Sequence, residues 1–139
     1  VIKDTPLAQT YAQGLFVPLS LDEAVTQAAW LYKELTQAGI KVIRIGLQAD
    51  EELCAEGNIL AGPFHPAMGE LVKSRVLRDE LTPKLLEQPK TKQQLTLHCP
   101  ARLESKLRGQ KNCNLHYWQQ LLPDVEIKIV PSEGEEISL

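Results

Sequence analysis

One stretch constrains the fold of this chain more than any other: a capped helix that runs directly into a β-branched segment. In "SLDEAVTQAAWLYKELTQAG", Ser20 and Glu23 have the spacing of a capping box, and Gly39 is a natural helix stop. The expected apolar stripe comprises Leu21, Ala24, Ala28, Leu31 and Leu35. "IKVIRIGL" follows at once, and its nearly continuous apolar run predicts a strand buried on both faces. This order of elements predicts an α/β fold.

Two further helices are expected on either side of that stretch. Thr5 suits an N-cap and Pro6 a first helical position, which predicts a short helix that closes near Gly14. After a loop-like region over residues 49–63, a second long helix is expected from Pro66, and Pro83 should end or kink it. Its apolar positions recur at i+4, at Met68, Val72 and Val76.

The corner before that long helix, "AGPFHPAMGE", combines two prolines with an aromatic residue and a histidine. Gly62 and Pro63 predict a turn, Phe64 an apolar contact, and His65 a residue of the helix-capping region. Local chemistry therefore predicts a structural corner.

The remainder of the chain has its own pattern after a polar, proline-broken linker at residues 86–94. Leu95 and Leu97 alternate, two short helices follow with a break at 109–112, and Val125 to Ile129 alternate again, as do Ile137 and Leu139. This predicts a small α+β lobe of order β-α-α-β-β. We therefore expect two domains, 1–89 and 90–139.

Composition limits the function classes. A net charge of −3 gives no whole-chain attraction for nucleic acid or anionic membrane, and no apolar run reaches the ~20 residues of a membrane span. Cys54, Cys99 and Cys113 are far apart with no CxxC pair, which favours reduced thiols and a cytoplasmic protein.

The common catalytic and metal-binding motifs are absent from the sequence. It has no G-x-G-x-x-G, phosphate loop, HExxH or paired Cys/His spacing, so we assign no catalytic and no metal-ligating residue. The histidines His65, His98 and His116 are isolated from one another. Surface or core positions are favoured for them over a zinc site assembled from distant parts of the chain.

Arg44 and Gln48 are the first candidate binding residues. On a strand they would share one face with Gly46, because side chains alternate. An arginine is costly to bury unpaired, so the polar face is expected either to meet a polar ligand or to form an ion pair with Glu70 or Asp50.

The "RGQKN" turn is the second candidate. Arg108 and Lys111 supply cations, and backbone N–H groups lie at a helix start, which are the ingredients for holding a phosphate backbone. The order of elements is similar to a KH domain, whose GXXG loop clamps nucleic acid. Here Gly109 keeps the first glycine and Asn112 replaces the second, and a third KH helix is absent. A plain helix–helix corner is the alternative and is favoured over RNA binding.

A series of motifs runs through the first three-fifths of the chain, at Val1 to Leu7, Tyr11, Phe16 to Ser20, Arg44 to Ile45, Gly57 to Gly62, and Glu70 to Arg75. In these motifs the chain resembles the later part of a radical S-adenosylmethionine (radical SAM) domain. Within that family it is similar to the radical-SAM region of the elongator-complex catalytic subunit and to oxygen-independent coproporphyrinogen III oxidase-like proteins.

The resemblance implies a fold and a role. The chain would be the C-terminal fragment of a radical SAM enzyme, the last part of a partial TIM-like barrel followed by the small lobe, which would help to bind substrate. Arg44, Gln48 and His65 would lie at the barrel mouth, near cofactor or substrate. The family's CxxxCxxC motif is missing here, so the 4Fe-4S cluster and S-adenosylmethionine are implied for the parent protein and not for this fragment, which is not expected to be catalytic alone.

The resemblance also suggests partners. The chain begins in a β-branched pair, like the end of a strand whose beginning is missing, so the N-terminal remainder of the parent chain is the expected partner. Exposed strand edges would favour a homodimer of the fragment. Among substrates, a tetrapyrrole, a tRNA and a protein side chain all remain open.

Overall fold

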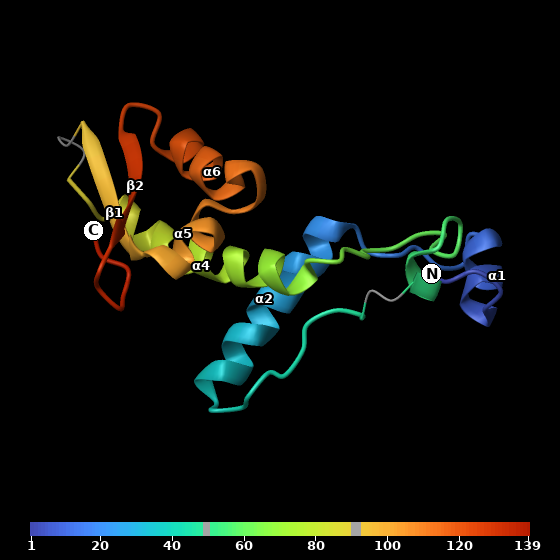
Figure 1. The fold of residues 1–139 in the computed structure, drawn as a ribbon. Helices are drawn as coiled ribbons and strands as arrows, with labels where there is room; N and C mark the ends of the chain where they lie inside the picture. The colour runs from blue at the N-terminus through green and yellow to red at the C-terminus, as the bar shows by residue number, and fades with distance from the viewer. Residues whose placement is uncertain (49–50, 90–92) are drawn as a thin grey trace. The chain divides into compact units, whose positions relative to one another are not determined.

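The structure is a computed structural model that describes residues 1–48, 51–89 and 93–139. The contacts between residues divide the chain into two compact units, Val1–Val72 (unit 1) and Lys73–Leu139 (unit 2) (Figure 1). The division falls earlier than the predicted boundary near residue 90, which itself lies outside the described residues. The reason is that Leu81 and Leu85 pack into the core of unit 2. The assignment of two domains stays a prediction.

The two capped helices of unit 1 form where the sequence predicts them. Helix α1 spans Pro6–Ala12, and the Thr5 hydroxyl accepts from the backbone N–H of Ala8 at 3.2 Å. Helix α2 spans Leu21–Gln37 after the Ser20 cap, and both halves of the capping box are present. Both N-cap predictions are confirmed.

The buried side of α2 differs from the predicted stripe. Val25 and Ala29 are the buried residues, whereas Leu31 is 50% exposed and Leu21 36% exposed. The buried face is therefore centred on positions that the predicted stripe did not include. Both buried residues have small side chains, so α2 buries little apolar area through them.

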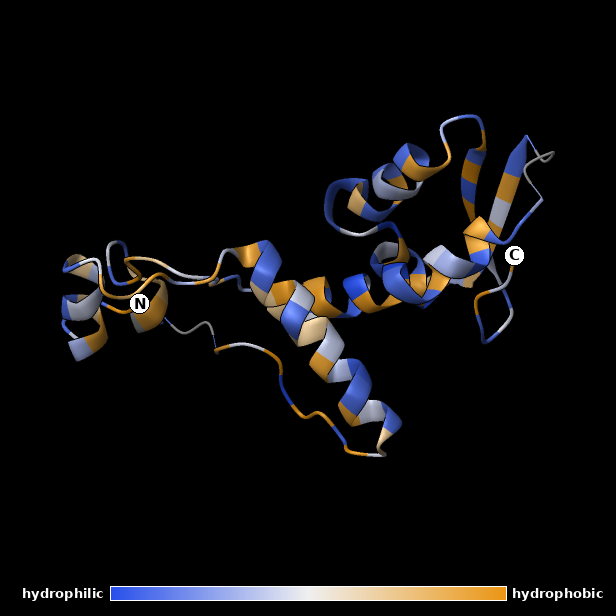
Figure 2. Ribbon diagram, turned by 180° about the vertical axis from the view of Figure 1, so that it is seen from behind, coloured by the Kyte–Doolittle hydropathy of each residue, from blue (hydrophilic) through white to orange (hydrophobic). Residues whose placement is uncertain are grey.

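The strand predicted for "IKVIRIGL" is wrong for this structure. Residues 40–48 form no strand, and Ile43 is 90% exposed. A strand needs a neighbour to bond with, and within the described part of unit 1 the β-pairing is a single antiparallel bridge between Ile2 and Ile59. The segment instead runs as an open stretch with several hydrophobic residues, which Figure 2 colours orange. A barrel therefore stays a prediction.

The start of the chain is tied to a later loop of unit 1. The backbone N–H of Lys3 donates to the carbonyl of Asn58 at 2.8 Å, and that of Leu60 donates to the carbonyl of Val1 at 2.9 Å. The short helix α3, Glu51–Cys54, precedes this loop. These bonds bring residues 1–3 and 58–61 side by side.

Helix α4 spans Met68–Leu86, beginning in unit 1 and ending in unit 2. Pro83 was predicted to end or kink the helix; it lies inside the helix, so the first alternative is wrong and the kink stays a prediction. Because Pro83 is in the final turn, the helix loses one late hydrogen-bond donor and still continues to Leu86.

Unit 2 contains a two-stranded parallel sheet and its crossover helices. The order is β1 (Gln94–Pro100), α5 (Ala101–Arg108), the short 3-10 helix η1 (Gln110–Asn112), α6 (Cys113–Leu121) and β2 (Glu126–Ser132). Both strands alternate hydrophobic and hydrophilic residues (Figure 2), with Leu97 opposite Ile129. The strand predicted over 137–139 is reduced to one antiparallel bridge between His98 and Ser138.

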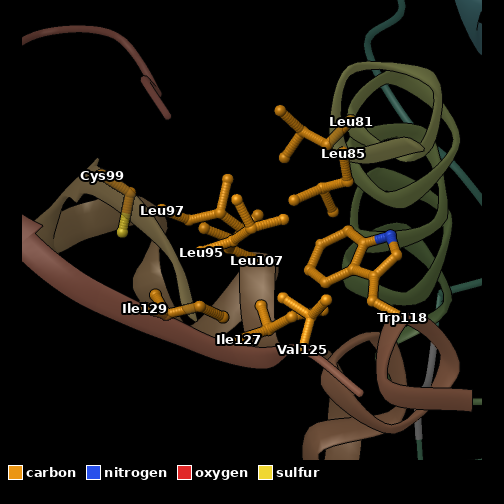
Figure 3. Close-up of a cluster of buried hydrophobic side chains, with 10 residues drawn as sticks. All are labelled: Leu81, Leu85, Leu95, Leu97, Cys99, Leu107, Trp118, Val125, Ile127 and Ile129. Carbon is orange, nitrogen blue, oxygen red and sulfur yellow. The ribbon is translucent and has the colours of Figure 1, made fainter. Parts of the chain in front are cut away.

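The core of unit 2 lies between the sheet and its helices. Trp118 is 1% exposed and faces leucines of α4, α5 and β1 (Figure 3). Its indole N–H donates to the Thr82 hydroxyl at 2.9 Å, so the one polar atom of the ring is satisfied. The cluster comprises Leu81, Leu85, Leu95, Leu97, Cys99, Leu107, Trp118, Val125, Ile127 and Ile129.

Candidate functional site

A hollow in unit 1 gathers the corner that the sequence singled out. Its volume is about 260 Å³, and its walls come from Val1–Ile2, Gly46–Leu47, the corner 61–65 and Met68, together with Leu53 and Ile59. These segments are distant in sequence and meet because the start of the chain bonds to residues 58–61. The corner is therefore part of a concave surface as well as a turn.

Two glycines set the close approach of these walls. Gly46 has φ +82°, and a Cβ there would lie 2.8 Å from the Cβ of Met68. Gly62 has φ +107°, and a Cβ there would lie 3.3 Å from the backbone nitrogen of Val1. Larger residues would force both the backbone conformation and the neighbouring wall to change.

His65 stands at the edge of this hollow and caps the turn that leads into α4. Its Nδ1 accepts from the backbone N–H of Ala67 at 3.1 Å. The backbone N–H of Met68 also donates to the His65 carbonyl at 3.1 Å. The predicted position of His65 in the capping region is confirmed, while its predicted contact with a ligand stays a prediction.

Arg44 and Gln48 lie together, although no strand holds them. The guanidinium of Arg44 donates to the Gln48 side-chain oxygen at 3.1 Å, and both residues are exposed. Asp50, one predicted ion-pair partner of Arg44, lies outside the described residues. Gln48 lines a second hollow of about 620 Å³ beside Lys3 and Asp4.

The two hollows of unit 1 are neighbours. Both are lined by Ile2, Leu47 and Leu53. His65 belongs to the first and Gln48 to the second, so two of the three predicted residues border one continuous region of unit 1. The apolar residues that the hollows share were not singled out by sequence reasoning, and only the flanking glycines could have indicated them.

The turn between α5 and α6 forms a separate, shallower surface on unit 2. It is lined by Arg108, Gly109, Lys111 and Asn112 together with residues of α5. Lys111 and Asn112 have φ values of 53° and 59°, in the left-handed region, and both are exposed. The prediction that Asn112 tolerates this conformation in place of glycine is confirmed.

Arg108 is held against its own unit. Its guanidinium pairs with Glu104 at 2.9 Å and donates to the carbonyl of Ile129 at 3.3 Å. The backbone N–H of Glu126 donates to the carbonyl of Gln93 and therefore faces β1. Because backbone groups alternate between the two edges of a strand, those of Val125, Ile127 and Ile129 face the open edge of β2. Gln119 donates to the Val125 carbonyl at 2.9 Å on that same edge.

A buried polar contact under the turn escaped sequence reasoning. The side-chain amide of Asn114, 2% exposed, donates to the carbonyl and hydroxyl of Ser74 at 3.1 and 3.0 Å and to the Leu107 carbonyl at 3.0 Å. These bonds join α4, α5 and α6 beneath Gly109. An asparagine in a helix carries no sequence signal for such a role.

The cysteines do not fit an iron–sulfur cluster. Cys99, one of the three cysteines in the sequence, is fully buried in the apolar core of unit 2, whereas Cys54 and Cys113 are exposed. Burial raises the pKa of the Cys99 thiol, which keeps it protonated. The part of the chain that the structure describes holds no group of three or more His, Cys, Asp or Glu placed for a metal ion.

The helices and the small parallel sheet define a mixed α/β protein, and none of its described helices is long and apolar enough to cross a membrane. Comparison with protein families then matches residues 1–78 to the Radical_SAM C-terminal domain. Since this is more than half of the sequence, the chain belongs to the radical SAM C-terminal domain family. No curated protein and no solved structure matches it.

Proposed function

We propose that this chain is the C-terminal accessory region of a radical SAM enzyme. Unit 1 docks on the domain that carries the iron–sulfur cluster, and its hollows border the substrate site. The apolar surface of unit 1 is the observation that carries the proposal. A resemblance to elongator-type or coproporphyrinogen oxidase-like enzymes, and the choice among their substrates, belongs to this proposal as well.

The exposed side chains lie in the region that matches the family. Ile43 is 90% exposed, Val17 84% and Trp30 65%. Among the described residues, most of the large hydrophobic side chains that are exposed belong to unit 1, which supports a second surface that covers this unit. The open segment 40–48 also has the β-branched composition of a strand, so a neighbouring sheet would satisfy both its backbone and its side chains.

The chemistry of the radical step would come from the parent enzyme. A cluster and S-adenosylmethionine supply a carbon radical when bound there, and this chain's cysteines do not fit as cluster ligands. Arg44 and Gln48 would present a polar, exposed pair to substrate or cofactor, and His65 would border the same region. Their role is positioning and binding.

The first test of this proposal is the sequence upstream of Val1 in the parent gene. We expect it to encode a CxxxCxxC motif, and an upstream sequence without that triplet would overturn the proposal.

The second test is docking. The cluster-bearing region and this chain are expressed as separate polypeptides, and we expect them to co-purify. Ile43→Asp should abolish co-purification, whereas Val130→Asp, at a 38% exposed residue of unit 2, should not. Equal effects of the two variants would contradict docking through unit 1.

A second candidate function is nucleic-acid binding by the α5–α6 turn. Two short helices joined by Gly109–Asn112, with Lys111 and Asn112 exposed on left-handed backbone, support it. Arg108 is engaged by Glu104, so Lys111 is the better residue to test. We expect salt-sensitive RNA binding that Lys111→Glu weakens and Lys41→Glu, at an exposed residue of unit 1, does not. Unchanged binding in Lys111→Glu would retire this candidate.

A further inference from the structure

We propose that the first hollow of unit 1 binds an uncharged, mostly apolar small molecule, or an apolar portion of the substrate, whose one hydrogen-bond acceptor takes the Nε2–H of His65. The inference rests on the proposed function, because it names the class of ligand for a site that the proposed function places beside the substrate. Ligand binding by unit 1 does not depend on docking to another domain, so the ligand site and the docking can each fail without the other.

The walls decide the class of ligand. Of the described residues that line the hollow, only His65 has a polar side chain; the others are aliphatic residues, phenylalanine, methionine, proline and glycine. No lining side chain offers a countercharge, and the α-ammonium of Val1 at this wall already donates to the Ala61 carbonyl, so a charged group would lose its hydration at a high cost. The methionine carboxylate and ammonium of S-adenosylmethionine are therefore poor occupants, and a neutral apolar group is a good one.

The volume sets the size of that group. The hollow measures about 260 Å³. An apolar cavity of ~150 Å³ holds one benzene ring, so this hollow suits a group of one or two rings or a branched aliphatic of similar bulk.

The tautomer of His65 supplies the single polar contact. Because Nδ1 accepts the backbone N–H of Ala67 at 3.1 Å, the proton of the neutral ring belongs on Nε2. Pro66 lies between these two residues and has no N–H to compete for the same acceptor. The ring therefore offers a donor and suits a carbonyl, ether or hydroxyl oxygen.

Backbone contacts hold the hollow in shape without a ligand. The glycines at 46 and 62 allow its walls to approach Met68 and Val1, and the bonds between residues 1–3 and 58–61 fix the opposite side. A longer ligand has a direction to extend, because the second hollow shares Ile2, Leu47 and Leu53 and offers Lys3, Asp4 and Gln48. The polar remainder of an amphipathic ligand would lie there.

The test uses two probes of matched shape on the 139-residue chain. 2-Acetonaphthone carries a carbonyl acceptor, and 2-ethylnaphthalene does not. Titrations followed by amide NMR should shift the signals of Gly46, Leu47 and Gly62 with both probes. The ketone should bind roughly fivefold more tightly, as one net hydrogen bond allows.

Three variants separate the hollow from other apolar surface. Ala61→Phe, which fills the hollow, should weaken both probes at least tenfold. His65→Asn keeps an acceptor for the Ala67 N–H but lacks Nε2, so it should reduce the ratio of the two affinities from roughly fivefold to about one. Ile43→Ser alters a 90% exposed side chain outside the hollow and should bind like the wild type.

Several results would overturn the inference. The first is that the probes bind equally tightly to the wild type and to a correctly folded Ala61→Phe chain. The second is an unchanged preference for the ketone in His65→Asn, and the third is loss of probe binding in Ile43→Ser. If Ala61→Phe does not fold, His65→Asn alone decides. Docking of Ala61→Phe to the cluster-bearing region, measured by co-purification, should be normal, so failure of the ligand site is distinguishable from failure of the proposed function.

Discussion

Unit 1 and unit 2 are similar in length and differ in what they bury. Among the described residues, the buried apolar side chains of unit 1 are small ones, namely Ala8, Val25, Ala29 and Val72. Unit 2 buries a ten-residue cluster that includes Trp118. Since burial of apolar area is the main favourable contribution to folding, unit 2 has most of the stability that this chain supplies for itself.

The difference shows which features of a sequence act locally and which need a partner. Helices α1 and α2 form in unit 1 because their caps and hydrogen bonds lie within a few residues. The segment 40–48 has the composition of a strand and forms none.

Trp118→Ala should lower the free energy of unfolding by about 3–5 kcal/mol, because it removes a fully buried aromatic ring and leaves a cavity. Urea denaturation followed by circular dichroism measures the loss. Trp30→Ala is the matched change in unit 1, at a side chain that is 65% exposed, and should alter the free energy of unfolding by less than about 1 kcal/mol. Similar losses in the two variants would contradict the difference in burial between Trp118 and Trp30.

Asn114→Leu should cost about 2–3 kcal/mol, because the carbonyls of Ser74 and Leu107 lose a buried donor. The same denaturation assay applies, and amide hydrogen exchange should rise in α5 and α6. Gln120→Ala, at an exposed residue of α6, is the control and should change little. Normal stability of Asn114→Leu would mean that this contact is not what joins the three helices.

Gly109→Ala should cost about 1–3 kcal/mol. Gly109 combines φ +73° with ψ 167°, and an added Cβ would lie 2.6 Å from the sulfur of Cys113. Gly39 in unit 1 has a similar φ of +74° but open space around it, so Gly39→Ala should cost only about 1 kcal/mol of backbone strain. Equal melting-temperature shifts would show that packing adds nothing at Gly109.

Ser20→Ala should have the smallest effect, about 1 kcal/mol on the stability of α2, because it removes half of the capping box. Hydrogen bonds from the backbone and hydroxyl of Ser20 lower the pKa of Glu23. As the pH falls, Glu23 is therefore protonated at a higher pH in the unfolded chain than in the folded chain. The stabilisation by Glu23 is present above the ordinary glutamate pKa and is lost as the pH falls below it. A pH titration of helicity that is unchanged by Ser20→Ala would contradict this link.

Sequence patterns predict most of the local structure here and little of the tertiary structure. The caps at Thr5 and Ser20 and the capping role of His65 are short-range effects that residue spacing reveals. The strand at 40–48 was mispredicted because its formation depends on a neighbour. The sequence alone does not decide whether α4 ends at Pro83, and the helix continues to Leu86 because Leu81 and Leu85 pack into the core.

The candidate site follows the same rule. The turn at Gly109–Asn112 was predictable because left-handed residues have a recognisable chemistry. The hollow of unit 1 was not predictable from the sequence, because only the folded backbone brings its walls together. These walls come from residues 1–2, 46–47, 53, 59, 61–65 and 68. The engagement of Arg108 by Glu104 and β2 likewise depends on contacts that no local pattern encodes.

The open edge of β2 has one more consequence. Two of its outward carbonyls, those of Val125 and Ile129, already accept hydrogen bonds from Gln119 and Arg108, and Pro131 has no N–H to offer. An incoming strand from another molecule would have to displace a paired guanidinium and a side-chain amide before it could add to the sheet. These side chains therefore make the edge of β2 a poor template for the addition of another strand.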